Sequence, residues 1–377
     1  MSSLRYLTAG ESHGVALNAI LEGLPAGVPV AQEAIDQELR RRQGGYGSGA
    51  RMQIEQDHAE ILSGVRAGKS LGSPIALLVQ NKDASFDRLP RVAHPRPGHA
   101  DLAGAIKYDH RDIRNILERA SARETTSRVA VGAVCKQFLA VFDIDMVSHV
   151  VAIGSITARV PDKLAWDTLR AAAEASPVRC VDKDAERKMM AEVDAMKTKG
   201  DTLGGIFEII VQGLPVGLGS HSHYDRRLDA ILAHAVMAIH AVKAVEVGDG
   251  IKGAAMPGSG VQDEIFYTKE QGFYRNSNRA GGFEGGMTTG QPVWLRGYLK
   301  PLSTLMKPLK SINIDTKAEV KATVERSDVC TVPAAGVIGE AVVAFALANA
   351  FLDKFGGDSI KETRRNYQGY IKQVKQF

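Results

Sequence analysis

The sequence predicts an α+β fold in which central helices are covered by β-sheets. Residues 337–352 are apolar nearly all round, and a helix of that kind is buried on most of its sides. The strand-like runs are grouped between helices and do not follow the strict strand–helix–strand alternation of a parallel sheet. Several of these runs alternate in polarity, which is typical of strands with one covered face.

The expected elements follow in chain order. Strands are expected at residues 4–8 and 15–22, a helix at 31–42, an irregular glycine-rich loop at 44–49, further strands at 74–80, 147–155, 206–213 and 293–299, and long helices at 112–142, 226–247 and 336–354. The helix at 31–42 turns Ile35 and Leu39 inward and ends in three arginines, which favour the negative end of the helix dipole. We expect one domain over residues 1–377, with the polar residues 356–377 as a solvated helical tail.

One internal echo predicts two related halves. Ile20-Leu-Glu-Gly-Leu-Pro-Ala-Gly27 resembles Ile210-Val-Gln-Gly-Leu-Pro-Val-Gly217, so a strand is followed in both places by the pattern Gly-Leu-Pro-x-Gly. Self-similarity indicates repeated structural units, and here it indicates an internal pseudo-repeat packed as one domain.

The composition favours a small anionic ligand over nucleic acid. The chain has 47 Lys and Arg against 43 Asp and Glu, a net charge of +4, whereas a dedicated nucleic-acid binder normally carries a stronger bias or a basic block. The rival interpretation is a polyanion-binding protein that uses the arginines at 40–42 and 111–128, and it predicts aromatic residues interleaved with the basic ones. Only Tyr108 lies near them, and acidic residues dilute both clusters.

The cysteines and the N-terminus predict a cytoplasmic protein. Cys135, Cys180 and Cys330 are scattered, odd in number and form no Cys-x-x-Cys pair, which favours reduced core thiols. The first residues lack the apolar core of a signal peptide, and the most apolar run, 337–352, falls short of a membrane span. We therefore expect no membrane partner.

The first candidate site lies in His94-Pro-Arg-Pro-Gly-His99. The two prolines hold the residues before them extended and the glycine permits a turn, so His99 stands on a stiff loop. The helix expected next has Asp112 as a suitable N-cap and places Arg119 and Arg123 on one face. A histidine beside stacked arginines suits an anionic substrate that must also be protonated. The alternative is an ordinary loop, then a surface helix whose glutamates neutralise its arginines.

Three further segments carry candidate chemistry. His13 lies in Gly10-Glu-Ser-His-Gly14, where the glycines allow a tight loop with an exposed imidazole; the alternative is a histidine bonded to backbone. Asp328 follows Arg326 two residues on, and the alternative there is a surface ion pair. Lys300-Pro-Leu-Ser-Thr304 follows a strand and could grip a phosphate or form a plain turn.

Two other patterns point to a flat ligand and to a metal. The segment from Asn278 to Met287 is too glycine-rich for a regular element and suits close approach of backbone to a flat ligand, with flexibility as the alternative. His221 and His223 would share one face of a strand, as metal ligands often do, but Asp225 is the only close carboxylate. We expect no metal site.

Three ordered motifs resemble the chorismate synthase family. They are Gly10-Glu-Ser-His-Gly-Val15, then Arg96-Pro-Gly-His-Ala-Asp101 with Glu118-Arg-Ala-Ser-Ala-Arg-Glu-Thr-Thr-Ser-Arg-Val-Ala130, and finally Arg326-Ser-Asp-Val-Cys-Thr-Val-Pro-Ala-Ala-Gly-Val-Ile-Gly-Glu340. Because these motifs extend from residue 10 to residue 340, the resemblance covers essentially the whole chain. It implies a helical core sandwiched between antiparallel β-sheets.

The resemblance also implies an activity. Members of this family convert 5-enolpyruvylshikimate 3-phosphate to chorismate and phosphate by an anti-1,4-elimination, the last step of the shikimate pathway to the aromatic amino acids. The reaction requires reduced FMN but has no net redox change. The substrate carries two carboxylates and a phosphate, so cationic groups must surround it, and the departing phosphate needs a proton or paired arginines. The reduced flavin can lend an electron transiently and take it back, so the cofactor performs the difficult step.

Site residues follow from the resemblance one position at a time. His13 would protonate the leaving phosphate, His99 would hold the reduced flavin in its monoanionic form, and Asp328 would assist deprotonation at flavin N5. The positions that would bind substrate anions are Ser12, Arg42, Ser48, Arg96 and Arg123. The positions that would contact FMN are Arg119, Ala120, Ser121, His240, Ala241, Gly285, Lys300, Pro301, Leu302, Ser303, Thr304 and Arg326.

One of these positions departs from the family pattern. Ser48 stands where the family usually has arginine, so one phosphate contact is in doubt, and Arg51 is the candidate substitute. His110 matches no family role and is expected to be structural. The resemblance further implies a homotetramer and leaves open whether NADPH reduces the flavin. A flavin-dependent oxidoreductase, which would turn over NAD(P)H and leave FMN oxidised, is the remaining rival.

Overall fold

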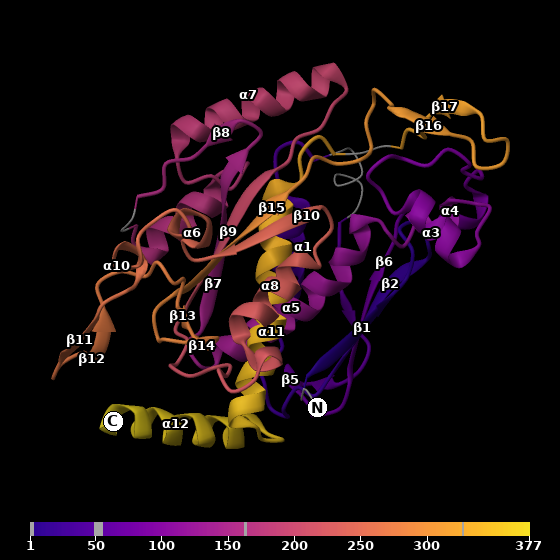
Figure 1. Ribbon diagram of the computed structural model, residues 1–377. Coiled ribbons are helices and arrows are strands. Elements are labelled where there is room, and N and C mark those ends of the chain that lie inside the picture. The colour runs from indigo at the N-terminus through magenta and orange to yellow at the C-terminus, as the bar shows by residue number, and fades with distance from the viewer. Residues whose placement is uncertain (1–3, 49–55, 162–163, 326–327) are drawn as a thin grey trace.

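Helix α11 (Val332–Phe355) runs between two β-sheets at the centre of the protein (Figure 1). The computed structural model describes residues 4–48, 56–161, 164–325 and 328–377. α11 has 24 residues and, within those ranges, is the one helix long and apolar enough to cross a membrane. The apolar segment is thus longer than expected, but 83% of its most apolar window is buried inside the protein, as in a core helix.

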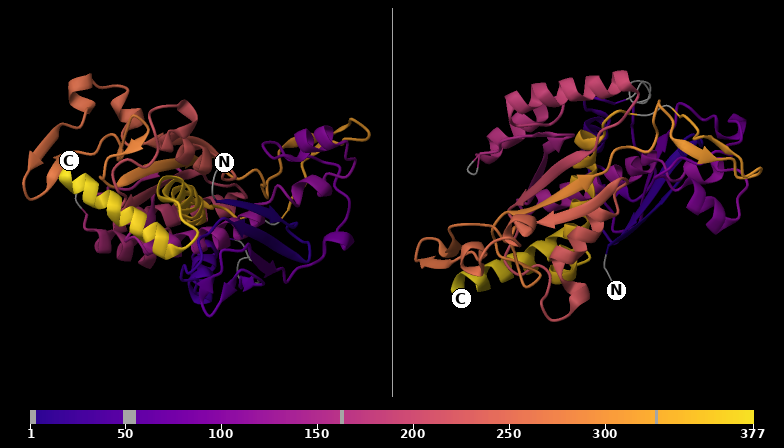
Figure 2. Two further views of the ribbon diagram at one scale, coloured as in Figure 1. Left: turned by 90° about the horizontal axis from the view of Figure 1, so that it is seen from below. Right: turned by 45° about the horizontal axis from the view of Figure 1, so that its top comes forward.

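Two sheets, both antiparallel throughout, flank this helix (Figure 2). The four-stranded sheet has the order β1 (Arg5–Ala9), β2 (Ala16–Glu22), β6 (Ile75–Gln80), β3 (Glu60–Ile61). The five-stranded sheet has the order β10 (Val242–Val247), β15 (Val293–Leu299), β9 (Gly205–Gln212), β7 (Asp145–Ile153), β8 (Ile156–Thr157). The predicted α+β sandwich is confirmed.

The remaining elements cover or extend this sandwich. The longer helices are α1 (Gln32–Gln43), α5 (Thr125–Ala140), α6 (Trp166–Ala175), α7 (Lys183–Lys199), α8 (Leu228–Met237) and α12 (Ile360–Gln376). The shorter helices are α3 (Asp101–Tyr108), α4 (Arg114–Leu117), α9 (Gly250–Gly253) and α10 (Gly258–Val261), with 3-10 turns at Phe86–Arg88, Ala122–Glu124 and Tyr224–Arg226. Small hairpins pair β4 (Val65–Arg66) with β5 (Lys69–Ser70), β11 (Ile265–Thr268) with β12 (Gly272–Arg275), β13 (Phe283–Glu284) with β14 (Met287–Thr288), and β16 (Lys310–Ile312) with β17 (Glu319–Lys321).

Close packing of helices in the core depends on glycine. Gly132 of α5 lies where α5 crosses α11 at Ala341, and a Cβ added to the glycine would lie 2.4 Å from the alanine Cβ.

The expected C-terminal helix is present as α12, but it is not wholly exposed to solvent. Tyr367 of α12 packs against Phe355 at the end of α11, with ring centroids 5.2 Å apart.

The internal pseudo-repeat is visible in the order of elements. The first half runs β1-β2-α1-β3-β6-α5 and the second runs β7-β9-α8-β10-β15-α11, and corresponding strands take corresponding places in the two sheets. The two Gly-Leu-Pro-x-Gly turns are fastened alike. The Ser70 hydroxyl donates to the Pro25 carbonyl at 2.6 Å, and the Thr288 hydroxyl donates to the Pro215 carbonyl at 2.6 Å.

The expectation of one continuous helix over 112–142 is wrong. The chain forms α4, a 3-10 turn and α5 instead, because Ser121 is extended (ψ 143°) and its hydroxyl accepts a hydrogen bond from the Arg123 N–H. Serine competes with helical backbone bonding in this way. Arg119 and Arg123 therefore do not share one helical face.

The helix expected over 226–247 is also too long. α8 ends at Met237, Ala241 has a left-handed conformation (φ 66°), and the chain continues as β10 against β15. The alternating, valine-rich sequence Val-Lys-Ala-Val-Glu-Val of β10 favours a strand, and this signal was missed.

Candidate active site

His13 is held by a buried carboxylate. It lies in the short loop between β1 and β2, where the His13 backbone N–H donates to Glu118 at 2.8 Å and Nδ1 lies 2.9 Å from the same oxygen. Glu118 is 1% exposed. The Ser12 N–H donates to the Glu118 carbonyl at 3.1 Å, so the loop is fixed at two successive residues.

The charge of Glu118 sets the tautomer of His13. Burial alone would raise the pKa of Glu118, but the hydrogen bonds from His13 and the charge of Arg114 hold that pKa below its ordinary value. The carboxylate is therefore ionised at neutral pH and accepts the Nδ1 proton. The other ring nitrogen, Nε2, points away from Glu118 and lies 4.0 Å from Asp83.

Two buried arginines converge on Asp57. Arg123 donates to both carboxylate oxygens of Asp57 at 2.6 and 2.8 Å, and Arg42 lies 3.5 Å from the second oxygen. Both arginines are less than 10% exposed. Arg123 also donates to the Asn81 side chain at 2.9 Å, and the Asn81 amide donates to the Gly14 carbonyl at 2.8 Å. This chain of hydrogen bonds joins the arginine pair to the His13 loop.

His99 forms the second histidine–carboxylate pair. Its Nδ1 hydrogen-bonds Asp101, which is fully buried at the start of α3. Arg96 donates from its backbone N–H (3.0 Å) and from Nε (2.8 Å) to the other oxygen of Asp101, and reaches Thr304 at 2.8 Å. Burial alone would raise the pKa of Asp101, but His99 and Arg96 together lower it well below its ordinary value.

The segment from Lys300 to Thr304 packs against the His99 loop. The Lys300 ammonium donates to the Gly98 carbonyl at 3.0 Å, and the Ser303 hydroxyl donates to the same oxygen at 2.8 Å. Burial and the nearby charge of Lys243 lower the pKa of Lys300. A hollow of about 520 Å³ borders this loop, between α3 and β16.

His240 lies between this region and the end of β1. Burial lowers its pKa, and Arg128, His99 and Arg119 lower it further, against the opposing effect of Glu124. Its Nδ1 is buried and has no hydrogen-bond partner among the described residues. Ala241, its neighbour, accepts the Lys300 N–H at 3.0 Å.

Arg119 directly follows Glu118 in the sequence, and its side chain lies at the end of β1. Its guanidinium donates to the carbonyls of Thr8 and Gly10, both at 2.9 Å. Ala120 and Ser121 come next and form the break before α5. The three positions therefore lie between the His13 loop and the His240 region.

A backbone hydrogen bond beyond the end of α1 brings the segments of two candidate residues together. The Val329 N–H donates to the Gly47 carbonyl at 2.9 Å. Ser48 directly follows Gly47, and Asp328 directly precedes Val329. Arg326 lies outside the described residues.

The fold places Gly285 away from the other candidate residues. It forms the turn between β13 and β14, which adjoins the Val293 end of β15, whereas Lys300 follows the opposite end of that strand. Its nearest neighbours are His221 and Met287. His223 bonds only its near neighbour Asp225, and the described ranges contain no group of three or more His, Cys, Asp or Glu side chains that could hold a metal ion.

Sequence reasoning named Glu118 only as a neutralising partner of arginines and did not single out the other carboxylates of this region. Glu118 and Asp101 lie inside the quoted motifs, and their short spacing from Arg114 and His99 was the available signal. Asp57 and Asn81 had no such signal, because they meet Arg123 only through the tertiary fold.

Comparisons with known proteins agree along the whole chain. Residues 4–352 match the family model described as chorismate synthase. The chain is 55% identical to the chorismate synthase of Symbiobacterium thermophilum, with 98% of this chain and 99% of that protein covered. It is 53% identical to the chorismate synthase of Geobacter sulfurreducens, covering 99% of this chain and all of the relative. A solved structure titled "Crystal Structure of Chorismate Synthase" aligns over 99% of both chains with a TM-score of 0.83 and 43% identity. The chain therefore belongs to the chorismate synthase family, whose members catalyse the final step of the shikimate pathway.

Proposed function

We propose that this chain eliminates phosphate from 5-enolpyruvylshikimate 3-phosphate to give chorismate, as a carbon–oxygen lyase. The observation that carries this proposal is a pair of histidines, each oriented by a buried carboxylate, with buried arginines joined to both by hydrogen bonds. His13 with Glu118 and His99 with Asp101 provide two proton-handling groups, and Arg42, Arg96 and Arg123 provide cations for the anionic substrate.

His13 is suited to assist the departure of phosphate. Glu118 keeps the proton on Nδ1, so the protonated ring presents a second proton on Nε2. As the carbon–oxygen bond breaks, its electron pair leaves with the phosphate oxygen, and that oxygen takes the Nε2 proton. Glu118 stabilises the imidazolium before the transfer, as the carboxylate partner of a catalytic histidine does.

The arginines are suited to hold the substrate in one orientation. Asp57 fixes Arg123 through two hydrogen bonds and lies close to Arg42, so the two cations share one anion and keep a net positive charge. Guanidinium groups fixed in this way need no reorganisation when charge develops on the leaving group. The Ser12 hydroxyl and the Ser48 side chain are the proposed neutral contacts.

The chain is proposed to bind reduced FMN, and three features fit that group. The buried, unpartnered Nδ1 of His240 calls for a polar ligand atom, the segment Lys300–Thr304 offers an ammonium and hydroxyls to a phosphate, and Arg119 to Ser121 lie close by. When bound, the reduced flavin supplies an electron that can be lent and recovered. His99 would hold a proton toward the ligand while Asp101 retains its Nδ1 bond, and Asp328 would assist deprotonation at flavin N5.

The assembly of the active unit is a further part of the proposal. The chain would act as one domain over residues 1–377, and its largest core cluster, which extends from Leu4 to Phe355, supports this. It would form a cytoplasmic homotetramer, in which Gly285 reaches the flavin of a partner subunit. Leu7 and Ile20 support such contacts, because they pair on adjacent strands of the four-stranded sheet and are 77% and 50% exposed. NADPH is the proposed reductant of the flavin.

An anaerobic assay tests this function. The protein is incubated with 5-enolpyruvylshikimate 3-phosphate and FMN that is either reduced by dithionite or left oxidised, and chorismate is followed by absorbance. Chorismate formation with reduced FMN alone is expected, and a parallel run with NADPH and oxidised FMN shows whether the chain reduces its own flavin. Binding of reduced FMN without any product would contradict the proposal.

A further inference from the structure

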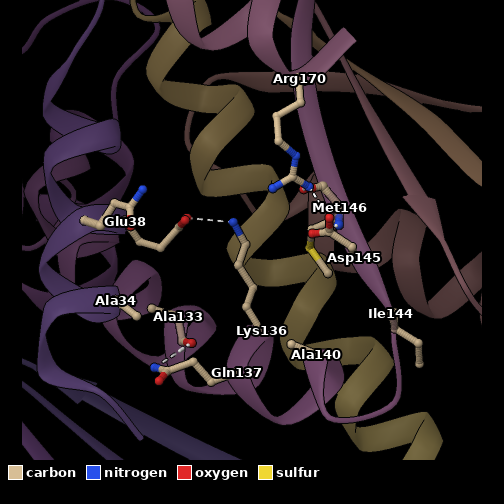
Figure 3. Close-up of a pocket in the computed structure, with 11 residues that line it drawn as sticks. Ala34, Glu38, Ala133, Lys136, Gln137, Ala140, Ile144, Asp145, Met146 and Arg170 are labelled. Carbon is tan, nitrogen blue, oxygen red and sulfur yellow. Dashed lines mark hydrogen bonds and ion pairs between the residues drawn. The ribbon is translucent and has the colours of Figure 1, made fainter. Parts of the chain in front are cut away.

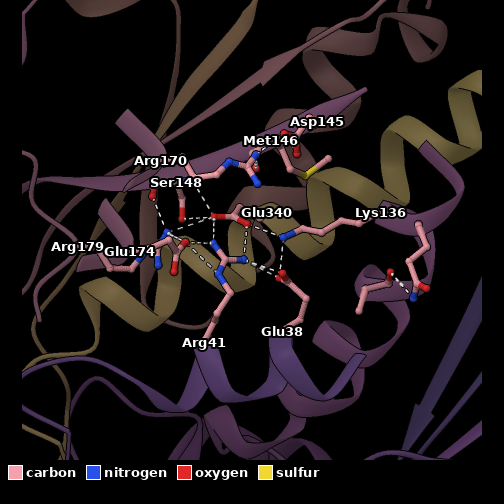
Figure 4. Close-up of polar contacts among 12 residues, drawn as sticks. Glu38, Arg41, Lys136, Asp145, Met146, Ser148, Arg170, Glu174, Arg179 and Glu340 are labelled. Atoms are coloured by element: carbon pink, nitrogen blue, oxygen red, sulfur yellow. Dashed lines mark hydrogen bonds and ion pairs between the residues drawn. The ribbon is translucent and has the colours of Figure 1, made fainter. Parts of the chain in front are cut away.

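A buried ion cluster surrounds Glu340 in the middle of α11 (Figure 4). Glu340 is fully buried and receives two hydrogen bonds from the Arg41 guanidinium, at 2.8 and 2.9 Å. Lys136 of α5 binds the same carboxylate, and Ser148 of β7 donates to it from its backbone N–H (2.7 Å) and hydroxyl (2.6 Å). Arg179 lies 3.6 Å away. One carboxylate thus joins α1, α5, α11 and β7.

The cluster is balanced in charge. Glu38 and Glu174 complete it: Arg41 donates to Glu38 at 2.7 Å and to Glu174 at 2.6 Å. The cluster therefore contains three cations (Arg41, Lys136 and Arg179) and three carboxylates (Glu38, Glu174 and Glu340). Burial would raise the pKa of Glu340, but Lys136 and Arg41 hold that pKa well below its ordinary value. Glu340 is therefore ionised at neutral pH.

The cluster is connected to the proposed substrate site through α1. Arg41 precedes Arg42, the proposed substrate ligand, and both occupy the last turn of α1. The loop that follows α1 packs against the start of α11, because a Cβ added to Gly45 would lie 3.1 Å from Pro333 and Gly47 accepts the Val329 N–H. The position of α1 along α11 therefore determines where Arg42, Ser48 and Asp328 stand relative to one another.

We propose that Glu340 and Arg41 are positioning residues for substrate binding, which fix α1 against α11 and so place Arg42. This inference rests on the proposed function. A two-pronged guanidinium–carboxylate pair fixes both distance and direction, which an apolar contact of the same volume does not. Buried ion pairs often add little stability over apolar replacements, so a role in geometry accounts for this one better than a role in stability.

The proposal predicts different effects of Glu340 on substrate binding and on flavin binding. Among the described residues, those proposed to contact FMN follow α4, precede β10, lie between β13 and β14 or follow β15. The hydrogen bonds and ion pairs of the cluster include none of them. A change at Glu340 therefore moves the substrate ligands and leaves the flavin ligands in place.

The test compares the two affinities in the holoenzyme. Glu340→Gln keeps the shape of the side chain and removes its charge, which leaves the cluster with one uncompensated cation. We expect the KM for 5-enolpyruvylshikimate 3-phosphate to rise about tenfold or more, because displacements near 1 Å cost that much in positioned sites. The Kd of FMN, whose proposed ligands lie outside the cluster, should stay within about twofold.

A compensating change distinguishes positioning from loss of fold. Lys136 borders a shallow hollow of about 240 Å³, where it also binds Glu38 (Figure 3). Lys136→Met added to Glu340→Gln removes the excess cation at the edge of the cluster, and it should restore the thermal midpoint without restoring the KM. If Glu340→Gln does not fold, Arg41→Lys, which keeps the charge and loses the two-pronged geometry, should show the same rise in KM.

Asp145→Asn is the matched control. It also removes one carboxylate charge beside the core, from β7, but Asp145 pairs with Arg170 and makes no described contact with the cluster, so the KM should not change. The inference is overturned if Glu340→Gln leaves the KM unchanged, or if substrate and flavin affinities fall together in proportion to stability. Absence of chorismate formation by the wild-type protein would instead refute the proposed function, and the inference with it.

Discussion

The exchange Glu118→Gln tests how His13 is used. Glutamine fills the same buried space and can still accept the His13 backbone N–H, now 2.8 Å from the carboxylate. It cannot hold the Nδ1 proton with a negative charge, so the ring loses the bond that orients Nε2 and stabilises the imidazolium. We expect kcat to fall while the KM for the substrate changes little, because the described contacts of the Glu118 side chain are with His13 and Arg114 and not with the proposed substrate ligands.

The magnitude follows from the bond that is lost. A hydrogen bond to a charged group contributes about 1.5–3 kcal/mol. Because about 1.4 kcal/mol corresponds to a factor of ten in rate, kcat should fall roughly 10- to 150-fold. The thermal midpoint should also fall, since Arg114 is 5% exposed and keeps only Glu325, at 3.0 Å, as an acidic partner among the described residues.

Glu325→Gln provides the control for this second effect. It removes the other acidic partner of Arg114, is 28% exposed and makes no described contact with His13. The assay is steady-state chorismate formation with reduced FMN under anaerobic conditions, together with a thermal melt of each variant. The reasoning is refuted if kcat of Glu118→Gln stays within about twofold of wild type, or if both variants lose kcat equally.

Three further outcomes are expected. Gly132→Ala should lower the free energy of unfolding by about 1–3 kcal/mol, because the new Cβ would lie 2.4 Å from Ala341 of α11. Gly369→Ala on α12 has open space around the new Cβ and should raise the free energy of unfolding by about 1 kcal/mol. Urea unfolding of both variants measures these two changes. Ser48→Arg should lower the KM for the phosphorylated substrate at least about tenfold, because it would add a charged hydrogen bond to the phosphate, and an unchanged KM would show that Ser48 does not face the phosphate. Acid should destabilise the fold, because the pKa values of Asp101 and Glu118 are lowered below their ordinary 3.8 and 4.5. The stability that these two carboxylates contribute is complete above their ordinary pKa values and is lost as the pH falls through their lowered pKa values. A urea midpoint that is equal at pH 6 and at about pH 3 would contradict this expectation.

Much of the fold could be predicted because its signals are local. The central helix shows an unbroken apolar sequence, and the strands at 206–213 and 293–299 show alternation or β-branched residues within a few positions. The breaks at Ser121 and Ala241 could not be placed in the same way. Each depends on one residue that leaves helical geometry, the first by a side-chain hydrogen bond and the second by a left-handed conformation.

The candidate site was predictable in its motifs and not in its partnerships. His13 and His99 stood out because of the glycines and prolines beside them. The carboxylates that orient them could be read only from the structure, since Glu118 is separated from His13 by 105 positions. Glu340 illustrates the same limit: it lies within an apolar sequence, and its proposed role depends on three other elements, α1, α5 and β7, that meet it in the fold.

The most direct test of the account is a single-turnover experiment without oxygen. Excess protein with reduced FMN is mixed with 5-enolpyruvylshikimate 3-phosphate, and phosphate, chorismate and the redox state of the flavin are measured in the same sample. The account predicts one phosphate and one chorismate for each substrate consumed, with the flavin still reduced at the end. Oxidised flavin in proportion to product would show net redox chemistry and would contradict the assignment of a lyase.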